Sequence, residues 1–284
     1  MPQIIQRGDG RPIVLVPGIQ GRHEWQRATV DTLAALGRVI TFSLCDEPTS
    51  QFAWSESAGF ENYLKQLDDV LRATGARRPL LVGISYGGLI SAEYAARHPS
   101  ALSGLVLASA PPPGWALPAR AQRYLESPRL MAPAFWLGAP SRTYPELKAA
   151  FPQRRDLLHF VMHQSLRIAG APASSSRMVR RLRWLKSGQF SIGRGLDVPA
   201  LIVTGEPELE RVVPPDDTLR YCEWLPQARV ERMAHTGHSG TVTKAAEFAR
   251  LVAEFMQTLS PGTWAAPAPA SAVAARSVRA DRVS

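Results

Sequence analysis

Gly83-Ile84-Ser85-Tyr86-Gly87 is the stretch that decides the fold, because it joins an apolar run to an alanine-rich one. Residues 80–84 have the pattern of a buried strand and residues 89–97 that of a helix. A serine at so tight a strand-to-helix turn needs small residues two positions before and after it, which the two glycines supply. The backbone N–H of Tyr86 and the positive end of the helix should then lie beside the Ser85 hydroxyl, where an oxyanion forms during acyl transfer.

Two further segments carry candidate groups at the ends of predicted strands. Residues 12–21 form an apolar run that ends in a glycine-rich turn, from which the N–H of Ile19 is expected to supply the second half of an oxyanion hole. The loop 233–240, between a short strand pattern and the last helical pattern, carries His235 and His238. A histidine there can act as the base that takes the serine proton.

These stretches together resemble the α/β-hydrolase family, whose members use a Ser-acid-His triad. The resemblance covers residues 13–21, 80–99, 103–110, 199–214 and 230–255. It implies a doubly wound, mostly parallel sheet, the chain order nucleophile, acid, histidine, and catalysis without a cofactor or a metal. The family's histidine follows a small residue just before the last helix, which favours His238, after Gly237, over His235.

Two glutamates compete for the place of the acid. In the family an Asp lies three residues after the glycine that ends the strand, and a hydrophobic pair and a proline follow it, the proline four residues on. Counting forward from Gly205 leads to Glu208, whereas counting back from Val212-Val213-Pro214 leads to Glu210. We expect Glu210, because the hydrophobic pair and the proline anchor the chain nearest the site. The alternative is that Glu206 and both candidates belong to a solvated acidic loop.

Metal binding is a weaker interpretation of the histidines. His235 and His238 have no Cys or Asp ligand nearby in the sequence and lie outside any predicted helix. His159 and His163 stand one helical turn apart without the intervening Glu of a zincin motif, which favours an ordinary helix face. The two cysteines are too few for a disulfide framework and are expected to be reduced.

Alternating strand and helix patterns predict one α/β domain with a parallel sheet. Expected strands are 12–17, 38–44, 79–84, 103–109, 199–204 and 228–233, and expected helices are 25–36, 56–74, 86–97, 216–224 and 243–258. Only about a dozen residues precede the first of these strands, so the family's eight-stranded sheet should lack its first strand, with residues 2–6 forming at most an edge strand. The hydrolase core then comprises residues 1–110 and 196–260, and the Ala- and Pro-rich residues 261–284 are expected to be a disordered tail.

Residues 111–195 interrupt the strand alternation and are too many for a bare loop. Helical spacing in 154–162 and 177–185 predicts a helical cap inserted over the carboxyl edge of the sheet. From 112 to 194, 14 Lys and Arg stand against three acids, which gives +11, more than the +9 of the whole chain. The three acids are Glu126, Glu146 and Asp156.

That basic charge has three interpretations. It can be a solvated, arginine-rich helix face, or it can attract an anionic substrate. It can also serve contact with a membrane surface through the amphipathic stretch 177–186, or with nucleic acid, for which no motif accompanies the charge. We expect no nucleic-acid partner, and a small-molecule substrate for which an anionic form is one option.

We therefore predict a serine hydrolase for carboxylic esters or related acyl compounds, working through an acyl-enzyme. Ser85 is the expected nucleophile, His238 the base and Glu210 the acid that orients it, and the N–H groups of Ile19 and Tyr86 form the oxyanion hole. The family also contains C–C bond hydrolases, lactonases, thioesterases and haloperoxidases, so the reaction subclass stays open.

The alternative is a non-catalytic receptor or scaffold that binds a small molecule on the same fold. It is favoured by Pro17, which stands where the family's oxyanion turn usually has a histidine. The N-terminus has no apolar leader and no run approaches the roughly 18 apolar residues of a membrane span, so we expect a cytoplasmic protein.

Overall fold

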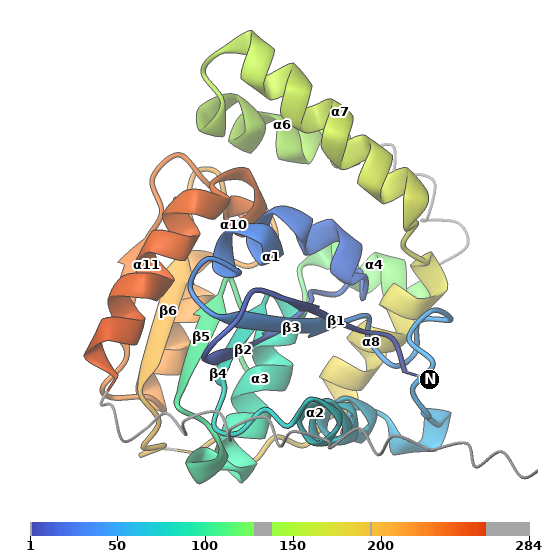
Figure 1. Cartoon of the computed structure of the whole chain (residues 1–284). Coiled ribbons are helices and arrows are strands. Elements are labelled where there is room, and N and C mark those ends of the chain that lie inside the picture. The colour runs from blue at the N-terminus through green and yellow to red at the C-terminus, as the bar shows by residue number, and fades with distance from the viewer. Residues whose placement is uncertain (1, 128–137, 194, 260–284) are drawn as a thin grey trace, which may run out of the picture.

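The computed structural model describes residues 2–127, 138–193 and 195–259, which are built around one central sheet (Figure 1). The sheet has seven strands in the order β1-β3-β2-β4-β5-β6-β7. They are β1 (Ile4–Arg7), β2 (Pro12–Val16), β3 (Arg38–Phe42), β4 (Leu80–Ile84), β5 (Gly104–Ala108), β6 (Ala200–Thr204) and β7 (Arg229–Arg232). β1 pairs antiparallel with β3 at one edge, and the remaining pairings are parallel. The predicted doubly wound, mostly parallel sheet is confirmed, with residues 4–7 as its edge strand.

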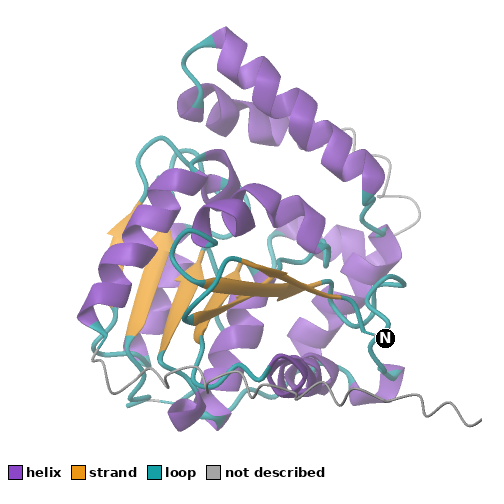
Figure 2. Cartoon of the chain, viewed as in Figure 1, coloured by secondary structure: helices purple, strands orange, loops and turns teal. Residues whose placement is uncertain are grey.

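Helices cover both faces of the sheet, as Figure 2 shows. Successive residues of a strand point to opposite faces, so Leu81 of β4 packs in one apolar cluster and Val82 in the other. The Leu81 cluster includes residues of α2 and α3, and the Val82 cluster includes residues of α1 and α11. These helices are α1 (Arg27–Leu33), α2 (Glu61–Thr74), α3 (Tyr86–Arg97) and α11 (Ala245–Thr258). Coverage on both sides explains why all five residues of β2, β4, β5 and β6 are buried.

Three predicted helices are divided into shorter segments. The pairs are η1 (His23–Gln26) with α1, η2 (Glu56–Ala58) with α2, and α9 (Pro215–Leu219) with η4 (Arg220–Glu223), while the predicted helix 243–258 corresponds to α11 and is preceded by the short α10 (Gly240–Thr243). In the second pair, Gly59 has φ 54° and ends the short first segment, because a left-handed residue cannot continue a helix. A further short turn, η3 (Pro99–Ala101), precedes β5.

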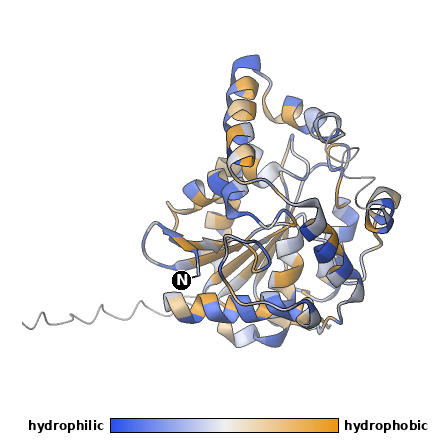
Figure 3. Cartoon of the chain, turned by 90° about the vertical axis from the view of Figure 1, so that its right-hand side faces the viewer, coloured by the Kyte–Doolittle hydropathy of each residue, from blue (hydrophilic) through white to orange (hydrophobic). Residues whose placement is uncertain are grey.

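The described residues between β5 and β6 contain helices and no strand. The helices are α4 (Ala119–Glu126), α6 (Ala139–Ala150), α7 (Arg154–Gly170) and α8 (Ser175–Ser187). α6 and α7 stand above the rest of the fold in Figure 1, and α7 mixes apolar and polar residues along its length (Figure 3). Gln164 of α7 donates to the carbonyl of Trp25 at 3.2 Å, which ties this helix to η1.

Two further observations concern the ends of the chain and the membrane. Residues 261–284, for which disorder is predicted, lie outside the described residues. In the described part of the chain, no helix combines the length and the apolar character needed to cross a bilayer.

Candidate active site

Ser85 occupies the turn between β4 and α3 in a strained conformation, with φ 54° and ψ −123°. A non-glycine residue held in such a region costs on the order of 1–3 kcal/mol and persists only where its surroundings impose it. Here the N–H of Ser85 donates to the carbonyl of Ala108 at 2.8 Å. A Cβ at Gly83 would collide with the Gly87 carbonyl oxygen, and one at Gly87 with that of Val16. The two glycines therefore allow β4, α3 and β2 to approach closely enough for the turn to form.

The structure brings Ser85, His238 and Glu210 into one hydrogen-bonded chain. Ser85 Oγ lies 2.9 Å from His238 Nε2, and His238 Nδ1 lies 3.2 Å from Glu210 Oε2. The other carboxylate oxygen of Glu210, Oε1, also lies 3.2 Å from Nδ1, and it accepts the N–H groups of Val212 and Val213 at 2.8 and 3.1 Å. These two bonds fix the carboxylate from behind, so its position does not depend on the histidine alone.

The competing side chains of the same loops lie elsewhere. Glu208 is exposed, and Glu206 accepts the N–H of His235 at 3.0 Å. The side chain of His235 is itself exposed. Of the three glutamates and two histidines that the sequence offered, the structure joins only Glu210 and His238 to Ser85.

The electrostatics of the site favour an ion pair between histidine and acid. Burial by itself would lower the pKa of His238, but the Glu210 carboxylate, through its charge and its hydrogen bond, and the charge of Glu146 raise it above the ordinary 6.5. Burial by itself would raise the pKa of Glu210, but His238 and the two backbone N–H groups lower it below its ordinary value. Glu210 is therefore an anion at neutral pH, and it stabilises a positive charge on His238.

The two backbone segments expected to bind an oxyanion both border Ser85. Tyr86 is the first residue of α3, where N–H groups have no acceptor within the helix. The turn that contains Ile19 is closed by a 2.9 Å bond from the N–H of Gly21 to the carbonyl of Gly18. A Cβ on Gly18 would lie 3.4 Å from the Cβ of Ser85, so this turn directly abuts the serine.

A buried arginine of α8 holds the Ile19 turn. Arg181 donates to the carbonyl of Ile19 at 2.7 Å, and its side chain is 0% exposed. The same guanidinium donates to Asp46 Oδ1 and Glu47 Oε1, each at 2.7 Å. Asp46 is thus paired with Arg181 and lies in a different cluster from His238.

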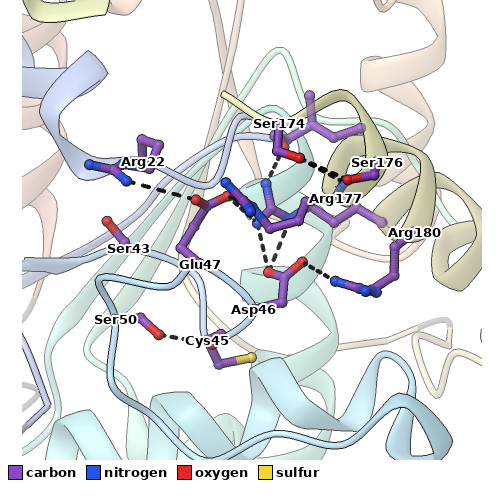
Figure 4. A network of polar contacts seen from close by, with 12 residues as sticks. Arg22, Ser43, Cys45, Asp46, Glu47, Ser50, Ser174, Ser176, Arg177 and Arg180 are labelled. Carbon is purple, nitrogen blue, oxygen red and sulfur yellow. Dashed lines mark hydrogen bonds and ion pairs between the residues drawn. The ribbon is translucent and has the colours of Figure 1, made fainter. Parts of the chain in front are cut away.

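The arginines of α8 bear on the three interpretations of the basic charge, because several of them are paired with carboxylates. Figure 4 shows carboxylates from the loop after β3 facing arginines of α8. Arg177 Nε donates to Glu47 at 3.0 Å, and Arg180 pairs with Glu56 at 2.8 Å. The apolar side of α8 is buried as well, at Met178, Val179, Leu182, Trp184 and Leu185. α8 therefore buries its apolar side and pairs three of its arginines with carboxylates, while Arg183 and Lys186 stay exposed.

One residue of the site was not singled out by the sequence. Glu146 of α6 is 3% exposed, and its two carboxylate oxygens lie 2.9 and 3.2 Å from the N–H of Ser239, the residue after His238. In the sequence it is merely one of three acids in a basic segment. No local pattern marks it, since its partner is 93 positions away.

The remaining candidate groups do not join this site. His159 and His163 contact each other on α7, with ring centroids 4.3 Å apart. Across residues 2–127, 138–193 and 195–259, no three His, Cys, Asp or Glu side chains are grouped as ligands for a metal ion. Both cysteines are free, and burial raises the pKa of the Cys45 thiol well above its ordinary value. Cys45 is therefore an inert thiol at neutral pH.

The sequence and the fold of this chain are similar to those of known hydrolases. The family model described as the alpha/beta hydrolase fold matches residues 11–245. The chain is 26% identical over 263 residues to a proposed carbamate hydrolase, RutD, of Variovorax paradoxus (89% of this chain, 95% of that protein). It is also 26% identical over 270 residues to the 2-hydroxymuconate semialdehyde hydrolase of Pseudomonas sp. (88% of each). Its structure is similar to that of the esterase EaEST from Exiguobacterium antarcticum, with a TM-score of 0.71, 19% identity and coverage of 90% of this chain and 95% of that one.

Proposed function

Since this chain belongs to the α/β-hydrolase fold family and is a hydrolase, we propose that it cleaves a carboxylic ester or a related acyl compound through a serine acyl-enzyme. One observation carries the proposal: Ser85 Oγ, both ring nitrogens of His238 and the Glu210 carboxylate form a continuous chain, with contacts of 2.9 and 3.2 Å. Such a chain can move a proton away from the serine while keeping the positive charge it creates beside an anion.

In the proposed mechanism, Ser85 Oγ attacks the carbonyl carbon of the substrate as His238 Nε2 takes the hydroxyl proton. The Nδ1–H of His238 donates to Glu210, which stabilises the imidazolium. The N–H groups of Tyr86 and Ile19 receive the negative charge on the substrate oxygen. His238 then gives its proton to the leaving group, and a water molecule, deprotonated by the same nitrogen, releases the acyl group from Ser85.

We further propose that residues 111–195 act as a cap over the core formed by 1–110 and 196–260. Two contacts support this division, because each joins the inserted segment to a part of the proposed machinery. Glu146 of α6 binds the N–H of Ser239, and Arg181 of α8 binds the carbonyl of Ile19. The cap would then shape the acyl site and determine the substrate.

The pairing of the cap arginines bears on the choice of substrate. An anionic substrate would have to compete with Asp46 and Glu47 for Arg177 and Arg181. We therefore propose an uncharged ester as the substrate. Carbamates should be tested as well, because one relative is named as a carbamate hydrolase. A cytoplasmic location stays a prediction.

A fluorophosphonate probe tests the proposal against the non-catalytic alternative. An active triad is covalently labelled at Ser85 within minutes, and Ser85→Ala abolishes both labelling and measurable ester hydrolysis without adding bulk to the turn. Ser109→Ala is a matched control, because Ser109 is another buried serine with positive φ, 44°, at the end of the neighbouring strand. Absence of labelling in the folded wild-type protein, or labelling that survives Ser85→Ala, would reject a Ser85 acyl-enzyme and favour a receptor or scaffold.

Once labelling is seen, a substrate screen defines the reaction. Short, long and aromatic esters, lactones and carbamates differ in the acyl and leaving groups that the cap must accommodate. Turnover that depends on Ser85 identifies the class.

A further inference from the structure

Glu146 makes an unusual contact for a residue of an inserted helix. Its carboxylate is 3% exposed and lies with both oxygens within 2.9 and 3.2 Å of the Ser239 N–H, on the loop that carries His238. Burying a carboxylate costs several kcal/mol unless hydrogen bonds or opposite charge offset it. The offset here comes from the backbone N–H groups of Gly237 and Ser239 and from the charge of His238.

Two carboxylates from different parts of the fold therefore act on His238, one at its ring and one at the backbone that follows it. Glu210 follows β6 and faces Nδ1 directly, whereas Glu146 comes from α6 and holds the backbone immediately after the ring. A backbone N–H bound to a carboxylate is a strong, charge-assisted bond. It fixes the loop at the residue next to His238, and with it the direction in which Nε2 points toward Ser85.

We propose that Glu146 is a positioning residue of the triad, which fixes the His238 loop and adds a second negative charge beside the imidazolium. This inference rests on the serine-hydrolase function proposed above. In this arrangement His238 is held in place only when α6 is docked on the core. The cap therefore contributes directly to positioning the catalytic histidine.

The charged groups around His238 agree with this arrangement. Glu210, from the loop after β6, and Glu146, from α6, both raise the pKa of His238 against the lowering effect of burial. Burial raises the pKa of Glu146, the backbone N–H groups and His238 oppose that rise, and Glu210 adds to it, so the net direction is upward. The protonation of His238 therefore depends on both carboxylates.

Two substitutions separate the two effects of Glu146. Glu146→Gln keeps an oxygen that can accept the Ser239 N–H but removes the charge, whereas Glu146→Ala removes both. Glu126→Gln is the matched control, because it removes the same charge from an exposed position on α4 of the same inserted segment.

The expected results differ between the variants. In Glu146→Gln, loss of the negative charge lowers the pKa of His238, so the acid limb of the kcat/KM profile moves to lower pH while KM changes little. In Glu146→Ala, kcat falls about tenfold, as for loss of a charge-assisted hydrogen bond, and the Ser239 amide exchanges faster with deuterium. Glu126→Gln behaves as the wild type in each measurement.

An NMR titration of the His238 ring, assigned with His238→Ala, keeps this test independent of turnover. A His238 titration curve unchanged in Glu146→Gln, or a kcat unchanged in folded Glu146→Ala, would overturn the inference. If Glu146→Ala does not fold, the isosteric glutamine variant decides alone. If instead no probe labels Ser85, the proposed function fails while the NMR result still reports whether Glu146 acts on His238.

Discussion

Replacing Glu210 with glutamine alters the triad while keeping its shape. Oε1 of Glu210 accepts the N–H groups of Val212 and Val213 at 2.8 and 3.1 Å, and both carboxylate oxygens lie 3.2 Å from His238 Nδ1. Backbone N–H groups can only donate, so the amide oxygen of a glutamine should stay with them and its NH₂ group should face Nδ1. His238 Nδ1 would then face this NH₂ group and a neutral amide oxygen in place of two anionic oxygens. The tautomer with the proton on Nε2 becomes populated as a result, and in that tautomer Nε2 cannot accept the proton of Ser85.

The expected loss is large, because the tautomer and the charge change together. In serine hydrolase triads, changing the acid to its amide lowers kcat about 10⁴-fold, which corresponds to roughly 5.4 kcal/mol in the activation free energy. Glu210 lies behind His238 with two further hydrogen bonds from the backbone, so water should not readily replace it. We expect a loss of this order in Glu210→Gln.

Steady-state hydrolysis of an activated ester measures the effect, with the rate of fluorophosphonate labelling as a second reading. Glu208→Gln is the matched control, since Glu208 is exposed two residues earlier in the same loop, and its kcat should stay within about twofold of the wild type because surface changes of this kind are nearly neutral. A loss of less than tenfold in a folded Glu210→Gln, or an equal loss in Glu208→Gln, would refute the reasoning.

Three further outcomes are expected. His238→Ala should lower kcat about a thousandfold or more, while His235→Ala, at an exposed position, should change it little; the opposite ranking would reassign the base. Because His238 must be neutral to accept a proton and its pKa is raised above 6.5, kcat/KM should fall as pH drops through a midpoint above that value, and a midpoint below it would contradict the arrangement. Arg181→Met should lower the free energy of unfolding by about 3–5 kcal/mol, because it removes the fully buried guanidinium that binds both Asp46 and Glu47 at 2.7 Å and leaves them only Arg22 and the partly exposed Arg177 and Arg180. Urea unfolding measures this, with the exposed Arg183→Met as the control. Equal stability of the two variants would argue against a structural role for the cluster.

The strands and the serine turn could be predicted because their constraints are local. A strand covered by helices on both faces is a continuous apolar run, as in 80–84, whose five residues are all buried. The turn at Ser85 needs two glycines at fixed spacing, and the backbone contacts of Gly83 and Gly87 show why. Both requirements involve neighbours in the chain, so they leave a pattern in the sequence.

The acid partner of His238 could be narrowed to two glutamates, of which the pattern favoured Glu210 without excluding Glu208. Counting from either side of the loop leads to different glutamates, since a loop two residues longer than usual can bulge at either end. Glu210 lies against His238 because its Oε1 binds the N–H groups of Val212 and Val213, which turns its side chain inward. That depends on the loop's conformation, and the sequence pattern does not specify it.

The sequence by itself determined the order of strands and helices, the turn at Ser85 and the histidine before the last helix, because each depends on spacing along the chain. The tertiary structure decided which charges meet. Arg181 pairs with Asp46 across 135 positions, and Glu146 reaches Ser239 across 93. A basic segment has the same composition whether it is solvated or paired, and only packing brings a carboxylate to it and excludes the water that would otherwise hydrate both charges.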